Sequence, residues 1–480
     1  MFFRLSPNFD ENKVFLLDWG KIENVFCVEF YRPIYLQNRE KIRKSKYGYS
    51  KVKKITLKVT KGETPLWKGE KYQESGIRFI RSENVLENTL NFNNSIYISE
   101  EVHKQMKRSQ LHQGDILLNI VGASIGRSCI FDLVESANIN QAVALIRLKE
   151  KYLPEWFSFL LNSNTIQLQI EQLKSGGARD NIDLKQIKDF EIPIHPLEVQ
   201  KIIVSKLSEA IVNRNNKKNE AQKLLNEIEV FLLTELDIAY QIVSSDIFED
   251  RIFETDFTRT LGNRLDPFYY QSDFEAINKA IMNSKYKDTV TKFRNCLSFI
   301  ESGSRPPGGV KNIEAGILSF GGEHVNWLGQ IEVKTPKYIP EKFHKNHRLT
   351  HTKLNDVLIV KDGATTGKIG IITSPEHVDQ NINEHVFLLR FNNLNPHFVT
   401  FLLNTSLFQK VIKRQITGAT VTGLTKQALK SILIPVPDMD IQNKLVETIS
   451  QKRKEAFQLI EDAEIEFTKT KKEIEKMILE

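Results

Sequence analysis

Three short stretches of the sequence contain residue types that could do chemistry, and the first looks like a phosphate-binding loop. The segment GATTGK ends in Lys368. A Walker A loop needs four residues between its glycines and a Ser or Thr after the lysine, because these groups bind the nucleotide phosphates and their magnesium ion. Here three residues separate the glycines, Ile369 follows the lysine, and a related segment earlier in the chain ends in Arg127. We therefore predict a turn between two strands with a basic residue at its exit.

The second stretch, Asp266–Tyr269, is similar to the acidic-Pro-Pro-aromatic tetrapeptide of adenine methyltransferases. It lacks the second proline, and no glycine-rich turn for S-adenosylmethionine precedes it. We interpret it as a turn at the start of the second half of the chain.

The third stretch contains His344, His347 and His351, a spacing that could bind a metal ion. Basic residues lie beside these histidines, and we find no counterpart to the run in the first half. We therefore expect solvated or phosphate-facing histidines and no metal. No Ser-His-Asp, Cys-His or paired-carboxylate arrangement recurs between the halves, so we predict a protein that is not an enzyme.

The chain repeats itself after about 240 residues. The stretch GDILLNIVGASIGR returns as NDVLIVKDGATTGK, and YLPEWFSFLLNS returns as LNPHFVTFLLNT. In the same way ESANINQAVALIR and FEIPIHPLEVQKIIV return as VDQNINEHVFLLR and ILIPVPDMDIQNKLV, and all four offsets lie between 241 and 243 residues. A unit of this size is too long for a solenoid repeat. We predict two homologous domains related by a pseudo-twofold axis.

Each repeat combines apolar strands, turns and a few helices. Gly76–Val85 and Gly316–Val325 predict a strand with a polar exit, and the runs ILLNIVG and VLIVKDG predict strands closed by a glycine. Trp156, Phe159 and Leu160 share one face of a helix by the i, i+3, i+4 rule. This mixture indicates an α+β fold.

A long charged segment follows each repeat, from about Pro196 to Leu236 and from Asp438 to Glu480. Apolar residues recur there at steps of three and four, which is typical of a coiled-coil seam. The seam positions are Ala221, Leu224, Ile228 and Phe231 in the first segment and Ala456, Leu459, Ala463, Phe467, Ile474 and Met477 in the second. Polar residues occupy two further slots, Glu235 after the first seam and Thr470 within the second. Helices of about 40 residues are about 60 Å long. The pseudo-twofold axis predicts an antiparallel pair, and the alternative is that each helix packs on its own domain.

The bulk composition fits a globular protein with two cores. The chain has 480 residues, of which 40% are hydrophobic and 26% charged, and its net charge of +7 is compatible with a polyanionic partner without requiring one. Three separated cysteines, Cys27, Cys129 and Cys296, fit a reducing cytoplasm and argue against disulfides or a zinc site. We see no apolar run of about 18 residues and no secretory signal, so we expect no membrane association.

These features resemble the specificity subunits of Type I restriction–modification systems over essentially the whole chain. Two motifs carry the resemblance: the hydrophobic block with its Gly-x-x-x-Gly-basic turn, and the helix start at Ile192–Gln200. The second copy of the helix start, at Ile434–Gln442, matches the family motif less well. Arg264–Tyr270 is similar to the family's opening of the second half, whereas Cys27–Tyr31 matches that opening poorly. The resemblance implies target recognition domains at 1–195 and 241–436, a central helix at 196–240 and a C-terminal helix at 437–480.

The resemblance implies a non-catalytic subunit that recognises double-stranded DNA. Each domain would read a few base pairs, largely in the major groove, where all four base pairs can be distinguished. The helix pair would fix the separation of the domains and dock two adenine methyltransferase subunits, which restriction/translocase subunits would join. This chain would bind no cofactor, since S-adenosylmethionine, ATP and Mg²⁺ would belong to the partners. The alternatives are a coiled-coil scaffold that no longer binds DNA, and an enzyme with a fused methyltransferase domain, whose motifs we do not find.

Seven basic residues are candidates for contacts with DNA phosphates. Arg127 and Lys368 are candidates because they occupy the same turn in the two repeats. The others are basic residues on or beside loops: Arg78, Arg81, Arg179, Arg305 and Lys361. For each of them, a solvated surface charge is the alternative.

The repeats also differ in the segments that we expect to read bases. RSENVLEN in the first repeat corresponds to GGEHVNWL in the second, and GGARDN in the first corresponds to GATVTG in the second. Different side chains present different donors and acceptors to the bases. We therefore predict an asymmetric, bipartite target whose half-sites are separated by a non-specific gap, with the gap set by the helix pair.

Overall fold

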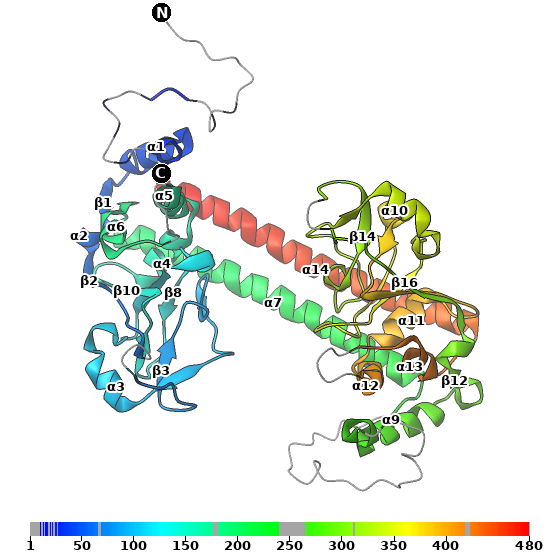
Figure 1. The fold of residues 1–480 in the computed structure, drawn as a ribbon. Coiled ribbons are helices and arrows are strands. Elements are labelled where there is room, and N and C mark those ends of the chain that lie inside the picture. Colours follow the sequence, from blue (N-terminus) through cyan, green and yellow to red (C-terminus); the bar gives the residue numbers. More distant parts are fainter. Residues whose placement is uncertain are drawn as a thin grey trace, which may run out of the picture. The chain divides into compact units, whose positions relative to one another are not determined.

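The computed structural model divides the chain into two compact units (Figure 1). It describes residues 27–65, 69–175, 181–239, 266–310, 313–417 and 423–479, with isolated residues at 10, 13, 15–17, 20, 22, 25 and 264. Unit 1 comprises residues 1–217 and 461–480, and unit 2 comprises residues 218–460. Each unit contains a mixed α+β domain and a part of both long helices, so the predicted α+β class is confirmed.

A four-stranded antiparallel sheet forms the centre of each unit, with the order β2-β10-β7-β8 in unit 1 and β13-β19-β16-β17 in unit 2. The strands are β2 (Thr56–Lys61), β7 (Asp115–Asn119), β8 (Ser128–Phe131), β10 (Val143–Leu148), β13 (Leu297–Ser302), β16 (Val357–Val360), β17 (Ile369–Ile371) and β19 (Val386–Phe391). Every residue of β7 and β16 is buried. Ile116 and Leu118 pack in one hydrophobic cluster and Leu117 in another, because alternate side chains of a strand point to opposite faces.

A smaller three-stranded sheet completes each domain, with the order β6-β3-β9 in unit 1 and β15-β14-β18 in unit 2. The central strand pairs in parallel with β9 or β18 and antiparallel with its other neighbour. The strands are β3 (Ile77–Ile80), β6 (Ile96–Ile98), β9 (Ala137–Ile139), β14 (Ile317–Phe320), β15 (Tyr338–Ile339) and β18 (Asn381–Ile382). The remaining pairs are β1 (Tyr49–Lys51) with β11 (Glu191–Pro193), β4 (Val85–Leu86) with β5 (Thr89–Leu90), and β12 (Thr291–Lys292) with β20 (Leu433–Ile434).

Short helices surround these sheets in both units. In unit 1 they are η2 (Val28–Tyr31), α1 (Pro33–Arg43), α2 (Val52–Ile55), α3 (Glu100–Gln105), α4 (Pro154–Asn162), α5 (Asn164–Ser175) and α6 (Leu184–Asp189). In unit 2 they are η7 (Pro267–Tyr270), α9 (Ser272–Met282), α10 (Glu341–Asn346), η11 (Arg348–Thr350), α11 (Pro396–Leu403), α12 (Ser406–Gln415) and α13 (Lys426–Ser431). The helix predicted around Trp156 is α4, and a proline stands at the first turn of α4 and of α11, where its missing N–H has no intrahelical partner to lose.

Both long helices form, α7 over Leu197–Glu235 and α14 over Met439–Leu479. Three alanines of the predicted seams, Ala221, Ala456 and Ala463, are at most 1% exposed. Side chains this small at a helix contact allow the helix axes to approach closely.

Within each unit, residue numbers rise along α7 as they fall along α14, so the predicted antiparallel pairing is confirmed. The pairs that share a hydrophobic cluster or an ion pair are Leu207 with Ile474 and Arg214 with Glu464 in unit 1, and Glu227 with Lys452 and Leu232 with Ile449 in unit 2. These contacts favour pairing of the helices over separate packing on the two domains.

Each long helix starts beside a buried glutamine, Gln200 or Gln442, that fixes it to the domain. Gln200 Oε1 accepts a hydrogen bond of 2.9 Å from the Leu153 N–H, and Gln200 Nε2 donates one of 2.8 Å to the His195 carbonyl. Gln442 makes the two equivalent bonds in unit 2, at 2.8 Å each. The helix start that degrades in sequence is therefore preserved in structure.

The two units also open in the same way, although their opening sequences match poorly. A 3-10 turn precedes an 11-residue helix in both, η2 before α1 and η7 before α9. Gln172 Nε2 donates to the Phe30 carbonyl at 2.9 Å, and Arg414 Nε donates to the Tyr269 carbonyl at 2.9 Å. Cys27–Tyr31 is thus the structural counterpart of the second opening, and the Asp-Pro-Phe-Tyr segment is a turn, as predicted.

His195 makes the attachment of α14 to unit 1 dependent on pH. Burial lowers the pKa of His195 from its ordinary 6.5, although the hydrogen bond from Nε2 to the Ile478 carbonyl at 3.1 Å acts the other way. The folded state therefore keeps His195 neutral, while the unfolded state takes up a proton below about pH 6.5 and gains stability. We expect local opening at the end of α14 to become easier by up to about 1 kcal/mol between about pH 7.5 and 5.5.

Hydrogen exchange of peptides from the end of α14 measures this effect. The variant His195→Gln retains an N–H donor for Ile478 but does not titrate, so its exchange, corrected for intrinsic rates, should lose this pH dependence. Equal pH dependence in both proteins would contradict the assignment to His195.

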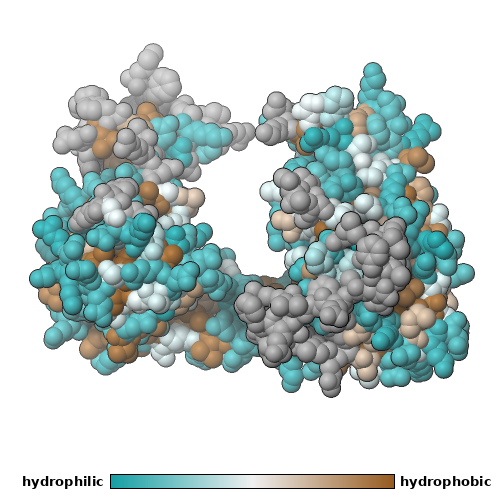
Figure 2. All heavy atoms as spheres, turned by 60° about the horizontal axis from the view of Figure 1, so that its bottom comes forward, coloured by the Kyte–Doolittle hydropathy of each residue, from teal (hydrophilic) through white to brown (hydrophobic). Residues whose placement is uncertain are grey.

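None of the helices among the described residues combines the length and the apolar character needed to cross a bilayer. On the face seen in Figure 2, the described surface is mostly hydrophilic, with hydrophobic residues in small groups.

Candidate nucleic-acid interface

A Gly-x-x-x-Gly turn connects two strands of the central sheet in each unit. Gly122 and Gly126 have φ angles of 79° and 92°, and Gly363 and Gly367 have φ angles of 89° and 97°. Residues with a Cβ atom are strained in this region, so the turn requires glycine. In unit 2 it leads from β16 into β17, whereas a phosphate loop leads into a helix. The predicted turn is confirmed.

The backbone closes both turns identically and places the two basic residues at the same point. Asn119 exchanges two backbone hydrogen bonds with the end of the first turn, at 2.9 and 3.0 Å, and Val360 does the same in unit 2, at 2.9 and 2.8 Å. Arg127 and Lys368 therefore occupy equivalent positions.

A glutamine from the next helix holds each turn in place. Gln167 in α5 donates through Nε2 to the carbonyls of Gly126, at 2.9 Å, and Leu161, at 2.8 Å. Gln409 in α12 makes the same pair of bonds in unit 2, at 3.0 and 2.8 Å. A Cβ atom on Gly126 would lie 2.5 Å from Gln167 Oε1, so a larger residue there would displace the glutamine. We did not predict this contact, although glutamine recurs at the same repeat position.

A buried carboxylate with a bidentate arginine fixes the other end of the strand that leads into each turn. Asp115, 1% exposed, accepts bonds of 2.6 and 2.7 Å from Arg147. Asp356, 2% exposed, accepts bonds of 2.7 and 2.8 Å from Arg390. The hydrogen bond to Asp115 raises the pKa of Arg147, against the effect of burial. We did not predict this pair either, although Asp and Arg recur at equivalent positions.

The two basic residues differ in their side-chain surroundings. Arg127 is exposed, and among the described residues no side chain pairs with its guanidinium. Lys368 Nζ lies 5.6 Å from the ring of Trp327, which is itself 53% exposed. A cation beside an exposed indole gives unit 2 a mixed cationic and aromatic surface at this turn.

A partly buried arginine of α14 contacts the turn that carries Trp327. Arg453 donates to the Leu328 carbonyl, and its guanidinium lies 5.2 Å from the Phe401 ring and 5.1 Å from the Phe457 ring. Burial lowers the pKa of Arg453 to about 10. This contact links the second long helix to the turn that carries the exposed indole.

Two other candidate residues, Arg78 and Arg81, already have partners within unit 1. Arg78 donates to Ser95 Oγ at 2.8 Å, forms an ion pair with Glu135 and lies 4.5 Å from the Phe92 ring. Arg81 donates to the Asn94 carbonyl at 3.1 Å and forms an ion pair with a neighbouring glutamate. Their contacts with DNA stay predictions, and these partners favour a structural role.

The remaining candidates lie in or beside unit 2 loops, with one exception. Arg305 is 66% exposed and lies 3.0 Å from Glu384, and Lys361 forms an ion pair with Asp362. Arg179 lies outside the described residues, as do most of the segments GGARDN and GATVTG.

In the other pair of segments expected to read bases, one pair of equivalent polar residues is buried. Asn84, 3% exposed, donates to the Asn91 carbonyl at 2.9 Å, and His324, 1% exposed, donates to the Thr335 carbonyl at 3.0 Å. These two side chains stabilise their loops. Glu87 and Trp327, at the same place in the two segments, are exposed.

The histidine run has a partial counterpart in unit 1, contrary to our prediction. His344 Nδ1 contacts Asn381 Oδ1 on β18, and His103 Nδ1 contacts Asn138 Oδ1 on β9 at 2.5 Å. His344 is 6% exposed, so it is not a solvated histidine. Sequence comparison missed His103 because the rest of the run is not repeated.

Comparison with known proteins agrees with this geometry. The family model for the Type I restriction modification DNA specificity domain matches residues 44–229 and again residues 274–468. The Type I restriction enzyme EcoBI specificity subunit of Escherichia coli is 32% identical over 139 residues, which cover 28% of this chain and 29% of that subunit. The MjaVIII specificity subunit of Methanocaldococcus jannaschii is 23% identical over 371 residues, which cover 73% of this chain and 76% of that subunit.

A solved S subunit of a Type I restriction–modification system from M. genitalium is similar at 11% identity and a TM-score of 0.40, over 91% of this chain and 96% of that one. The family model matches most of the chain, once in each repeat. The chain therefore belongs to the Type I restriction–modification DNA specificity family, whose members are DNA sequence-recognition subunits.

Proposed function

We propose that the chain reads an asymmetric, bipartite DNA target, one half-site with each unit. The observation that carries the proposal is the duplicated turn, which presents Arg127 or Lys368 at an equivalent place in the two units. Contacts of such cations with phosphates fix the register of a protein on DNA, and base contacts nearby supply the specificity.

The exposed side chains beside the turns support the proposal that the two half-sites differ in sequence. Trp327 is 53% exposed in unit 2. The corresponding residue of unit 1 is Glu87, whose carboxylate lies 2.7 Å from Lys471 Nζ. An indole offers an apolar face and one N–H donor, whereas a carboxylate only accepts, so the two surfaces favour different base edges.

We further propose that the long helices dock two adenine methyltransferase subunits, with restriction subunits joining that core. Exposed apolar side chains on the helices support this role: Ile202 is 49% exposed, Val212 54%, Val230 66% and Ile465 58%. The chain itself would carry no catalytic site and bind neither S-adenosylmethionine nor ATP. A protein that acts in this way works in the cytoplasm, where the DNA is.

Removing the two turn cations tests DNA binding. We expect Arg127→Ala and Lys368→Ala each to weaken binding of the chain, assembled with its methyltransferase, by a similar factor on all DNA sequences. Each should reduce the slope of log K against log salt by about one, because one phosphate contact is lost. Fluorescence anisotropy over a range of salt concentrations measures both quantities.

Arg127→Lys and Lys368→Arg are the matched controls, because they preserve the charge and should preserve the slope. If both alanine variants keep wild-type affinity and slope, the turns do not contact phosphate. If the wild-type assembly binds no DNA at all, the coiled-coil scaffold becomes the better description.

A further inference from the structure

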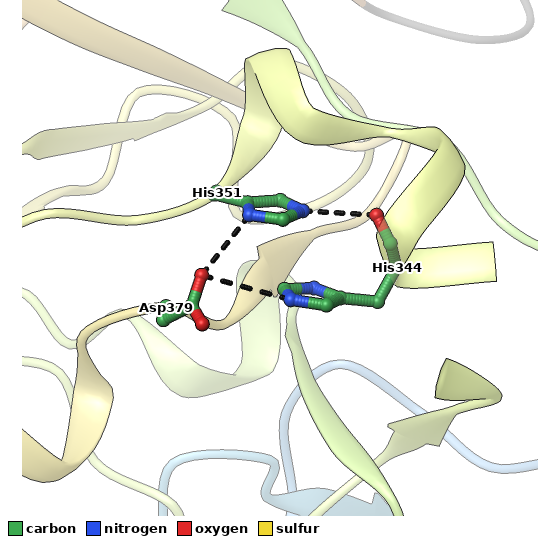
Figure 3. A group of neighbouring side chains, drawn as sticks. All are labelled: His344, His351 and Asp379. Atoms are coloured by element: carbon green, nitrogen blue, oxygen red, sulfur yellow. Dashed lines mark hydrogen bonds and ion pairs between the residues drawn. The ribbon is translucent and has the colours of Figure 1, made fainter. Parts of the chain in front are cut away.

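Three side chains of unit 2 converge on one point beside β18 (Figure 3). His344 comes from α10, His351 follows η11, and Asp379 precedes β18. His351 Nδ1 lies 3.0 Å from Asp379 Oδ1, and His344 Nε2 lies 3.6 Å from the same oxygen. One nitrogen of each ring and the carboxylate oxygen all lie within 4.8 Å of one another.

The second nitrogen of each ring is already committed as a donor. His351 Nε2 donates to the His344 carbonyl at 2.9 Å. His344 Nδ1 faces Asn381 Oδ1, and the amide nitrogen of Asn381 donates to Thr350 Oγ1 at 2.9 Å, which leaves Oδ1 as the acceptor. In the neutral rings the nitrogens that face Asp379 therefore carry lone pairs. Two lone pairs and a carboxylate that point at one another repel unless a proton or a metal ion lies between them.

This arrangement is the one that metal-binding histidines use, in which the outer N–H donates to a carbonyl or amide oxygen and orients the ring. Zinc binds nitrogen at about 2.0–2.1 Å and carboxylate oxygen at about 2.0–2.2 Å, so tetrahedral ligand atoms are roughly 3.3 Å apart. The 3.0 and 3.6 Å separations lie on either side of that value. The rings are stacked, with centroids 3.7 Å apart and an interplanar angle of 5°, so one ring must turn for both lone pairs to meet the ion.

Unit 1 shows that the fold itself does not need these ligands. Gln110 takes the place of His351 and donates through Nε2 to the His103 carbonyl at 2.7 Å. Ser136 stands where unit 2 has Asp379. An amide therefore suffices for the structural hydrogen bond, and the imidazole and carboxylate of unit 2 are additional to it.

We propose that unit 2 binds one zinc ion through His344 Nε2, His351 Nδ1 and the Asp379 carboxylate. Asp379 is 72% exposed, so the fourth position is open to water. The ion would tie α10 and η11 to β18, an edge strand of the three-stranded sheet, and would act as a structural clamp. His347, whose Nδ1 lies 2.8 Å from the Phe343 carbonyl, takes no part.

The metal content of the full-length chain, freed of any affinity tag, tests the proposal. After equilibration with zinc and dialysis, mass spectrometry should find one zinc per wild-type chain. His351→Gln copies the residue of unit 1 and preserves the hydrogen bond, and Asp379→Asn preserves the backbone conformation, whose φ of 57° suits Asn as well as Asp. Both variants should fold and lose the ion, whereas His347→Gln should retain it.

Hydrogen exchange gives a second readout. Zinc at about 100 times its dissociation constant should slow exchange of α10 and β18 about 100-fold in the wild type and in His347→Gln, and not in the two ligand variants. A wild-type chain that takes up no zinc would overturn the proposal and leave a histidine–aspartate ion pair. Equal zinc uptake by wild type and ligand variants would also overturn it, because the ion would then lie elsewhere.

Discussion

A four-residue insertion into both long helices is expected to change the gap length of the DNA target and leave both half-site sequences unchanged. The sites are between Asn215 and Lys218 in α7 and beside Glu464 in α14, because Arg214 and Glu464 pair there at 3.0 Å. Four residues add about 6 Å of helix, close to the length of two base pairs. On the natural target the variant should lose modification, since the half-sites no longer coincide with the recognition surfaces. Methylome sequencing of a host that carries the variant gives the new motif directly.

The natural protein provides the complementary experiment. Adding one base pair to the gap moves a half-site by about 3.4 Å and turns it by about 35°, so we expect modification to be abolished, while base changes within the gap should have little effect.

The matched control for the helix insertions is a variant with the same four residues inserted at Gly308–Gly309, an exposed turn of unit 2. This variant should preserve the gap length. A palindromic or continuous methylated motif would contradict the bipartite model.

Replacing Arg147 by leucine is expected to destabilise the central sheet of unit 1 by about 3–5 kcal/mol, because it leaves the Asp115 carboxylate buried without its partner. Arg390→Leu should do the same in unit 2, where Asp356 is 2% exposed. Hydrogen exchange in β7 and β10, or in β16 and β19, should accelerate by roughly 100-fold or more.

The control for this effect is an ion pair on the surface. Lys44→Leu removes a pair with Glu40 whose side chains are 73% and 62% exposed, and it should cost at most about 0.5 kcal/mol. The double variant Asp115→Asn with Arg147→Leu removes the orphaned charge and should recover part of the loss. If Arg147→Leu costs no more than Lys44→Leu, the buried pair does not stabilise the sheet.

The repeat made much of the fold predictable. Four matched segments at nearly constant offset indicated two domains, and a largely regular spacing of apolar residues indicated the helix pair. The turn between β7 and β8 could be predicted as well, because glycine at both ends of a short connection has a local conformational cause. The poor match of Cys27–Tyr31 hid a 3-10 turn that both units share, because that turn is held through backbone carbonyls, whose partners can be glutamine or arginine.

The candidate site was less predictable, because the partners of its side chains come from distant parts of the sequence. A basic residue beside a loop contacts DNA or pairs within the protein, and only the structure shows that Arg78 packs against Phe92 and Ser95. Asp379 lies 28 residues from His351 in the sequence. Backbone hydrogen bonds between Thr352 and residues 379–380 bring the two side chains together, and sequence spacing does not predict these bonds.

The way in which the turns are held has a consequence for how such a protein can evolve. Gln167 and Gln409 fix the turns through main-chain carbonyls, which every residue type provides. The identity of the outward side chain therefore has little influence on the folding of the turn, and the two copies have already diverged to Arg127 and Lys368. Mutations that alter the exposed surface need not be accompanied by compensating changes in the interior. Selection can thus explore new recognition surfaces on an unchanged scaffold, independently in each half of the chain.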